Sequence, residues 1–196
     1  MAEKLSLVVL LGDSIRMGYQ KVVARELAGV AEVWFPEENG CHTKHTLARL
    51  PVWFADREPT MVHLNIGLHD MWVNEDGSNR HALPEYLADL RQVIGWLQCH
   101  ISSRLVFALT TPVDQDRQCA SAYGRVVRRN GDIPRYNAAT RSLMESLGIG
   151  VNDLYTVVEE AGTDRLIADD GVHFRPEGYE ILGQAVAARI RQELAG

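Results

Sequence analysis

The sequence predicts a three-layer α/β/α sandwich around a five-stranded parallel sheet. Short runs of apolar and β-branched residues alternate with longer segments whose apolar residues recur at helical spacing. Several of the short runs are apolar throughout, which is typical of parallel strands covered by helices on both faces. With 196 residues, of which 46% are hydrophobic, the chain can bury one sizeable core. We therefore expect one domain over residues 1–196.

The order of the elements follows from these runs. The expected strands are Leu5–Leu11, Val30–Phe35, Thr60–Ile66, Arg104–Thr110 and Ile149–Val151. A helix is expected to reach Leu27, because Tyr19, Val22 and Val23 share its apolar face. Three further helices are expected to begin at Pro84, Pro134 and Pro176. Proline suits the first turn of a helix, where the backbone N–H has no helical partner.

Four polar segments interrupt this alternation: Pro36–Thr43, Gly67–Leu83, Thr111–Ile133 and Gly162–Arg175. The first three follow expected strands directly. Because the carboxyl ends of parallel strands meet at one edge of the sheet, we expect these segments to gather there. Open α/β sheets bind their ligands at that edge.

Composition excludes several classes of protein. The formal charge is -6, from 26 acidic residues against 20 Lys and Arg, which opposes binding to nucleic acid or to a membrane surface. The longest apolar run, Leu5–Leu11, is too short to span a membrane and lacks the pattern of a signal peptide, so we expect a cytoplasmic protein. The three cysteines, Cys41, Cys99 and Cys119, are expected to be reduced because their number is odd and their spacing wide.

The segment Gly12-Asp13-Ser14 lies where the first strand gives way to the first helix. A serine in that turn projects its hydroxyl near backbone N–H groups and the positive end of a helix, which suits acyl transfer. The alternative is structural, with Asp13 or Ser14 capping the helix and Gly12 easing the turn.

The segment Asp170-Gly171-Val172-His173 precedes the last helix. A serine nucleophile needs a base to accept its proton, and that base needs a carboxylate to fix its tautomer. Asp170 and His173 supply both groups, three residues apart. The alternative is an ordinary Asp-Gly turn followed by an exposed histidine.

With these two motifs in this order, the chain resembles the SGNH, or GDSL-type, serine hydrolases over nearly its whole length. The resemblance implies a flavodoxin-like sandwich, with Ser14 as the nucleophile and Asp170 and His173 completing a catalytic triad. It also implies that no metal or cofactor is needed.

The same resemblance indicates donors to the oxyanion. Besides the Ser14 N–H, one is the backbone N–H of a glycine after the second strand, matched here by Gly40, although Asn39-Gly40 is also a turn dipeptide. The other is an asparagine after the third strand, where this chain has His69 in Gly67-Leu68-His69-Asp70. An imidazole can donate one hydrogen bond when neutral. The alternative is that His69 is an ordinary loop residue.

The motifs and the resemblance together predict a serine esterase that removes a short acyl group, preferably acetyl, from a small polar or carbohydrate substrate. A lysophospholipase or thioesterase of the same fold, or a binding protein in which His69 marks lost catalysis, is the alternative. Magnesium-dependent phosphoryl transfer by Asp13 is disfavoured because Ile15 stands where a second carboxylate would be needed. No oligomeric state is predicted.

Three groups of side chains have a structural and a functional interpretation. Core packing is favoured over a substrate wall for the aromatic residues Trp34, Phe35, Trp53, Phe54 and Trp72. Solvated surface charge is favoured over an anion site for Arg125, Arg128 and Arg129. A zinc site is disfavoured for Cys41, His42 and His45, since a second ligand cluster is missing.

Overall fold

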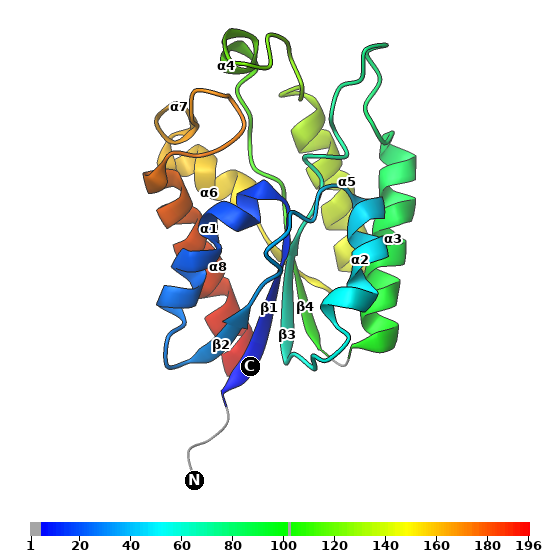
Figure 1. Cartoon of the computed structure of the whole chain (residues 1–196), viewed down its shortest axis with the longest axis vertical. Helices are drawn as coiled ribbons and strands as arrows, with labels where there is room; N and C mark the ends of the chain where they lie inside the picture. The colour runs from blue at the N-terminus through cyan, green and yellow to red at the C-terminus, as the bar shows by residue number, and fades with distance from the viewer. Residues whose placement is uncertain (1–4, 102) are drawn as a thin grey trace.

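A five-stranded, all-parallel sheet forms the centre of the molecule (Figure 1). The computed structural model describes residues 5–101 and 103–196. The strands are β1 (Ser6–Gly12), β2 (Ala31–Trp34), β3 (Met61–Asn65), β4 (Arg104–Ala108) and β5 (Gly150–Asn152). Their order is β2-β1-β3-β4-β5, which is the flavodoxin-like order. The predicted fold class is confirmed.

Helices cover both faces of the sheet. They are α1 (Ser14–Glu26), α2 (Thr43–Trp53), α3 (Leu83–His100), α4 (Gln115–Ala120), α5 (Asp132–Ser146), α6 (Leu154–Ala161), α7 (Thr163–Leu166) and α8 (Pro176–Ala195). On one side α8 packs against α1 and α6, and on the other α3 packs against α2 and α5 (Figure 1). Within the described ranges, no helix combines the length and apolarity required to cross a membrane.

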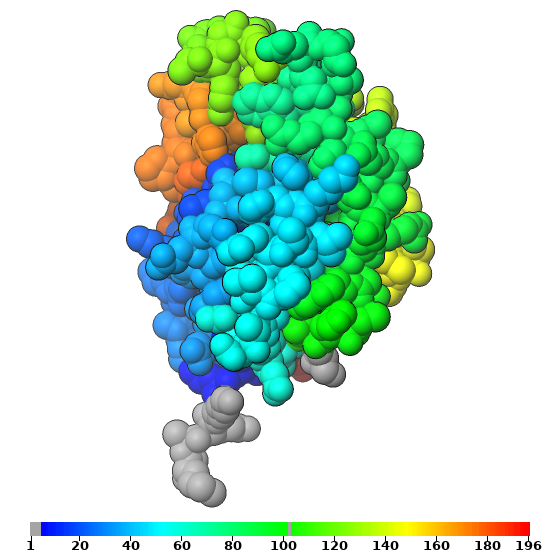
Figure 2. Space-filling view, turned by 45° about the vertical axis from the view of Figure 1, so that its right-hand side comes forward, coloured from blue at the N-terminus to red at the C-terminus, as the bar shows by residue number. Residues whose placement is uncertain are grey.

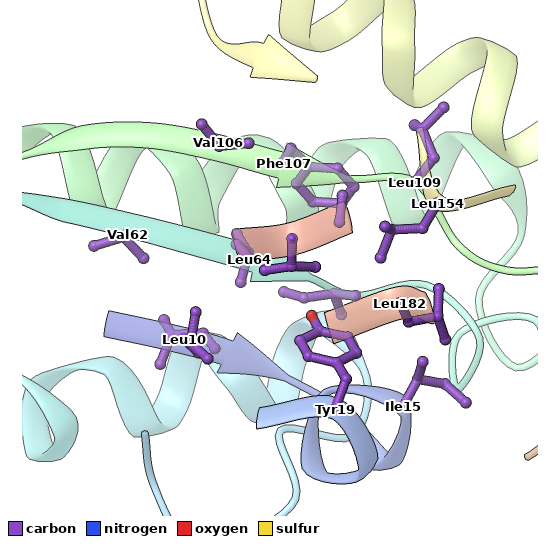
Figure 3. Packing of buried hydrophobic residues seen from close by; sticks show 14 of the residues in the cluster. Leu10, Ile15, Tyr19, Val62, Leu64, Val106, Phe107, Leu109, Leu154 and Leu182 are labelled. Atoms are coloured by element: carbon purple, nitrogen blue, oxygen red, sulfur yellow. The ribbon is translucent and has the colours of Figure 1, made fainter. Parts of the chain in front are cut away.

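Burial of the central strands explains why their sequences are runs of mostly apolar residues. Val8 to Leu11 of β1 are fully buried, and β3 is buried along its whole length. Figure 3 shows Leu64 of β3 and Phe107 of β4, which are register partners on adjacent strands, among the buried apolar side chains. A sheet that is buried on both faces leaves few positions for polar side chains.

Among the described residues, four helices lie where the sequence predicted none: α2, α4, α6 and α7. The start of α2 is capped by His42, whose Nδ1 accepts the N–H of His45 at 3.3 Å, and Pro51 lies inside the helix. Neither feature is typical of a helix of this length. In addition, α5 begins at Asp132 rather than at Pro134.

Two long segments extend beyond the carboxyl edge of the sheet, as predicted. Residues 67–82 follow β3 and residues 111–131 follow β4, and Figure 2 shows them side by side at the top of the molecule. The N–H of Val73 donates to the carbonyl of Val127 at 3.0 Å, which joins the two segments. Together they form the border of the site described next.

Candidate active site

Ser14 is the first residue of α1, directly after the turn that ends β1. Gly12 has a φ of 155°, and a Cβ there would lie 2.4 Å from Asn65 Oδ1, so the turn requires glycine. Asp13 is the N-cap and accepts the N–H of Ile15 at 3.0 Å. The capping role therefore falls to Asp13, which leaves the half-buried Ser14 hydroxyl at the positive end of the helix.

The loop before α8 brings a histidine and a carboxylate to this hydroxyl. His173 Nε2 lies 2.8 Å from Ser14 Oγ, and His173 Nδ1 lies 2.5 Å from Asp170 Oδ2. The other oxygen of Asp170 accepts the N–H groups of Val172 and His173, both at 2.9 Å. These distances are those of a nucleophile, a base and a group that orients the base.

The electrostatics of Asp170 suit that arrangement. Burial acts to raise the pKa of its carboxyl, but hydrogen bonds from the His173 ring and from the N–H groups of Val172 and His173 outweigh burial and hold the pKa below its usual value. The group is therefore ionised at neutral pH. A carboxylate at Nδ1 keeps the proton on that nitrogen and leaves Nε2 free to accept one.

A buried hydrogen-bond network fixes the turn before Ser14 to β3. Asn65 Nδ2 donates to Asp13 Oδ1 at 3.0 Å, and Asn65 Oδ1 accepts the hydroxyl of Tyr19 at 2.6 Å. Burial raises the pKa of Asp13. Sequence reasoning missed Asn65 and Tyr19. The only available signal was an asparagine at the end of a strand that is otherwise apolar except for His63.

Gly40 lies against the same turn. Its N–H donates to the carbonyl of Gly12 at 2.9 Å, and a Cβ at this position would lie 2.6 Å from that oxygen. The backbone N–H that the resemblance implies as an oxyanion donor therefore already has a partner at the end of β1. The Gly40 N–H can donate to a substrate only if its hydrogen bond to the Gly12 carbonyl breaks. Its role as an oxyanion donor stays a prediction.

His69 follows β3 and is half-buried. Burial, followed by the charges of Arg128 and Arg80, lowers its pKa to about 4. The ring is therefore neutral at pH 7 and carries one N–H donor. The next residue, Asp70, accepts the N–H of Thr43 at 3.1 Å and its hydroxyl at 2.6 Å, which ties this loop to the start of α2.

One cluster in the described part of the chain has the size of a metal site. Ligand atoms of His81, Glu85 and Asp89 lie within 4.8 Å of one another. The ammonium of Lys44 lies 2.5 Å from a Glu85 oxygen and 3.8 Å from an Asp89 oxygen, so the cluster already faces a cation. The cysteine and histidines considered as zinc ligands from the sequence do not form this cluster.

The candidate active site does not coincide with a cavity of about 850 Å³ elsewhere in the molecule. That cavity lies at the amino ends of the strands, and Leu7, Glu32, Thr60 and His100 are among its lining residues. Ser14 and His173 lie at the opposite edge of the sheet. There the chemistry of the side chains, rather than the volume of a pocket, identifies the site.

The remaining candidates divide between core and surface. Trp53 and Phe54 are core residues, as favoured from the sequence, whereas Trp72 is half-buried. Arg125 is exposed, in line with the surface interpretation. For Arg128 that interpretation is wrong, because its side chain is 3% exposed and its Nε donates to the carbonyl of Leu68 at 2.7 Å. The three cysteines are free, as expected.

Residues 10–181 match the GDSL-like lipase/acylhydrolase family. The chain belongs to this family. It is accordingly a carboxylic ester hydrolase, and its substrate is a small molecule.

Individual relatives are distant in sequence. The human isoamyl acetate-hydrolyzing esterase 1 homolog is 25% identical over 191 residues, which cover 89% of this chain and 77% of that protein. A lipase/acylhydrolase from Enterococcus faecalis superposes with a TM-score of 0.80 at 22% identity, covering 96% of this chain and 97% of the other. A catalytic mutant of an acetylxylan esterase from Geobacillus stearothermophilus superposes with a TM-score of 0.76 at 18% identity, covering 97% and 96%. The two solved structures share the fold.

Proposed function

We propose that the protein is a serine esterase that removes a short acyl group, acetyl in the first place, from a polar carbohydrate-like substrate. Ser14 is the nucleophile, His173 the base and Asp170 the group that orients it. The observation that carries this proposal is the contact of 2.8 Å between Ser14 Oγ and His173 Nε2. That contact joins two residues that are 159 positions apart in the chain.

In the acylation step, Ser14 Oγ attacks the ester carbonyl carbon while its proton passes to His173 Nε2. The carbonyl π electrons move to the oxygen, which becomes an oxyanion. When this tetrahedral intermediate collapses, the bond to the alcohol oxygen breaks, and the proton on His173 goes to the departing alcohol. Water then attacks the acyl-Ser14 carbonyl carbon while His173 Nε2 takes a proton from it. When this second intermediate collapses, the bond from the acyl carbon to Ser14 Oγ breaks, His173 returns the proton to Oγ, and the carboxylic acid leaves.

The oxyanion needs hydrogen-bond donors held in place before the reaction. The Ser14 N–H at the start of α1 is one donor, and His69, as a neutral imidazole, is the second. Gly40 is the third if its N–H leaves the Gly12 carbonyl. Asp70, which is fully buried and bonded to Thr43, supports the position of His69 through the backbone.

Two observations support a short acyl group and a polar alcohol. Acetylxylan esterases are among the proteins of similar fold, and the human relative is named for the hydrolysis of an acetate ester. The segment at residues 74–80, above the carboxyl edge, consists of polar residues and glycine. Such a border suits a hydrated alcohol better than a fatty chain.

A series of 4-nitrophenyl esters from acetate to decanoate tests the proposal. We expect kcat/KM to be highest for acetate and to fall with chain length. Ser14→Ala should abolish turnover, whereas Ser146→Ala, at the opposite edge of the sheet, should retain it. A fluorophosphonate should add one label, at Ser14, as shown by peptide mass mapping.

Other outcomes point to the alternatives. A maximum at long chains would replace the proposal with a lysophospholipase, and a preference for thioesters over oxygen esters would replace it with a thioesterase. Equal turnover by the wild type and by Ser14→Ala would remove Ser14 from the reaction.

A further inference from the structure

Three arginines surround one tryptophan at the carboxyl edge of the sheet. The guanidinium carbons of Arg80, Arg125 and Arg128 lie 5.8, 5.9 and 5.2 Å from the centre of the Trp72 ring. Trp72 and Arg80 belong to the segment after β3, and the other two arginines to the segment after β4. We call these four residues the Trp72 patch.

The arginines of the Trp72 patch bind backbone carbonyls rather than carboxylates. Among the residues that the structure describes, none of its arginines forms a salt bridge. Each donates to a backbone carbonyl instead: Arg80 to His69 at 3.3 Å, Arg125 to Val73 at 3.0 Å and Arg128 to Leu68 at 2.7 Å. This clustering stands out in a chain with a formal charge of -6.

Arg128 is the buried arginine of the Trp72 patch. Its side chain is 3% exposed, and its Nη1 is buried without a hydrogen-bond partner among the described residues. Burial of a cation is costly, and it lowers the pKa of Arg128 although the nearby Asp13 carboxyl acts in the opposite direction. Two further cations beside Arg128 increase the cost. An anion bound at the Trp72 patch offsets that cost.

The Trp72 patch also lies beside the candidate active site. Arg80 and Arg128 bind the carbonyls of His69 and Leu68, which belong to the loop directly after β3. Leu68 and Asp13, the residue before Ser14, line the same small cavity. The charges of both arginines also act on the His69 ring and lower its pKa, which agrees with this proximity.

The three arginines of the Trp72 patch differ in solvent exposure and therefore in the role that each can play. Arg80 and Arg125 are exposed and Trp72 is half-buried, so a ligand can reach all three. Arg128 is buried, so its positive charge attracts the anion without direct contact. Guanidinium groups bind carboxylates and phosphates through paired N–H donors, and the ring of a tryptophan offers an apolar face to a sugar.

The Trp72 patch is held in place before any ligand arrives. Gln118 Oε1 accepts the N–H groups of Val127 and Arg128, both at 2.8 Å, and Gln118 Nε2 donates to the carbonyl of Arg128 at 3.2 Å. The N–H of Asp114 donates to the carbonyl of Gly171 at 2.8 Å, which connects this segment to the loop that carries His173. A ligand bound here is therefore positioned relative to the triad.

We propose that the alcohol part of the substrate is anionic, and that its carboxylate or phosphate binds Arg80 and Arg125 against Trp72 while the short acyl ester reaches Ser14. This inference rests on the proposed esterase function and extends it to a substrate class, the acylated acidic sugars and acylated sugar or polyol phosphates.

Matched substrate pairs test it. Acetylated glucuronate is compared with acetylated glucose, and acetylated glycerol phosphate with acetylated glycerol, by acetate release at low ionic strength. We expect the anionic member of one pair to have a kcat/KM about 10–100-fold higher than the neutral member, the range of one charge-assisted hydrogen bond. The pair that shows the difference identifies the anion as carboxylate or phosphate. Added salt should reduce the ratio.

Variants locate the effect. Arg80→Gln and Arg125→Gln should each lower the ratio of anionic to neutral kcat/KM, whereas Arg91→Gln, an exposed arginine on α3, should keep the wild-type ratio. A ratio near one in both pairs, or a high ratio that survives both substitutions, would overturn the proposal.

Calorimetry on Ser14→Ala separates this inference from the esterase proposal. Glucuronate or glycerol phosphate should bind at least about tenfold more tightly than glucose, and Arg80→Gln in that background should weaken the binding. Binding without hydrolysis of any ester by the wild type would refute the esterase function and leave the anion site standing. Hydrolysis of esters without anion binding would refute the anion site alone.

Discussion

His63 should make the folded protein sensitive to acid. It lies in β3 with no exposed surface, its Nε2 lies 3.2 Å from Asn152 Nδ2, and its Nδ1 has no partner among the described residues. Burial, and then the charge of Arg189, lowers its pKa from 6.5 to about 3. Between these two pH values the unfolded chain binds a proton at His63 that the folded chain does not bind. The free energy of unfolding therefore falls as the pH falls through this window.

The size of the effect follows from the shift. One pH unit corresponds to about 1.4 kcal/mol for one proton within this window, so acidification from pH 7 to pH 4.5 should cost roughly 2.5–3 kcal/mol through His63 alone. That is a substantial part of the stability of a typical domain, about 5–15 kcal/mol. The histidine at the candidate oxyanion site, with a pKa of about 4, adds to the loss in the same direction.

Urea unfolding followed by circular dichroism at pH 7 and pH 4.5 measures this loss. His63→Leu removes the titrating group, so its loss between the two pH values should be smaller than that of the wild type by about 3 kcal/mol, whatever its absolute stability. His100→Leu, an exposed histidine at the end of α3, should behave as the wild type. If wild type and His63→Leu lose equal stability, burial of His63 does not oppose its protonation and the reasoning is wrong.

Three further predictions concern the site. His69→Ala should lower kcat by about 10²–10³ with a smaller effect on KM, and His69→Asn should recover much of that activity with the wild-type pH profile above about pH 5, because the pKa of the ring is about 4. Tyr19→Phe leaves the buried Oδ1 of Asn65 without its donor and should cost about 1–3 kcal/mol, visible as a lower Tm. Gly40→Ala places a Cβ 2.6 Å from a backbone oxygen of the nucleophile turn, so both kcat/KM and Tm should fall. Unchanged values in any of these assays would contradict the contact concerned.

The sheet could be predicted from the sequence because its strands are buried on both faces. Thr60–Ile66, for example, contains the observed strand Met61–Asn65 with one residue to spare at each end. Helices without a regular apolar stripe could not be predicted in this way. In α2, Lys44 and His45 follow the unusual cap at His42, so neither the cap nor the periodicity indicates a helix.

The three candidate catalytic residues, Ser14, Asp170 and His173, could be proposed from the sequence because each belongs to a short local motif, and the fold brings these motifs together. The network beneath them has no local motif. Asn65 reaches Asp13 because β1 and β3 pair with Gly12 opposite Asn65. That register is a property of the assembled sheet, and no spacing along the chain encodes it.

Arg128 shows the same dependence on topology. In the sequence it stands among charged neighbours in a long polar segment, where exposure is the ordinary outcome. In the fold its acceptor is the carbonyl of Leu68, and Gln118 holds its backbone. Leu68 and Arg128 meet because β3 and β4 are adjacent and parallel, so that the segments following them leave the sheet at the same edge. The adjacency of β1 and β3 brings the loop that carries His69 beside Ser14. One strand order thus explains both the candidate catalytic centre and the unpaired positive charge beside it, which is why we treat the two as parts of one substrate site.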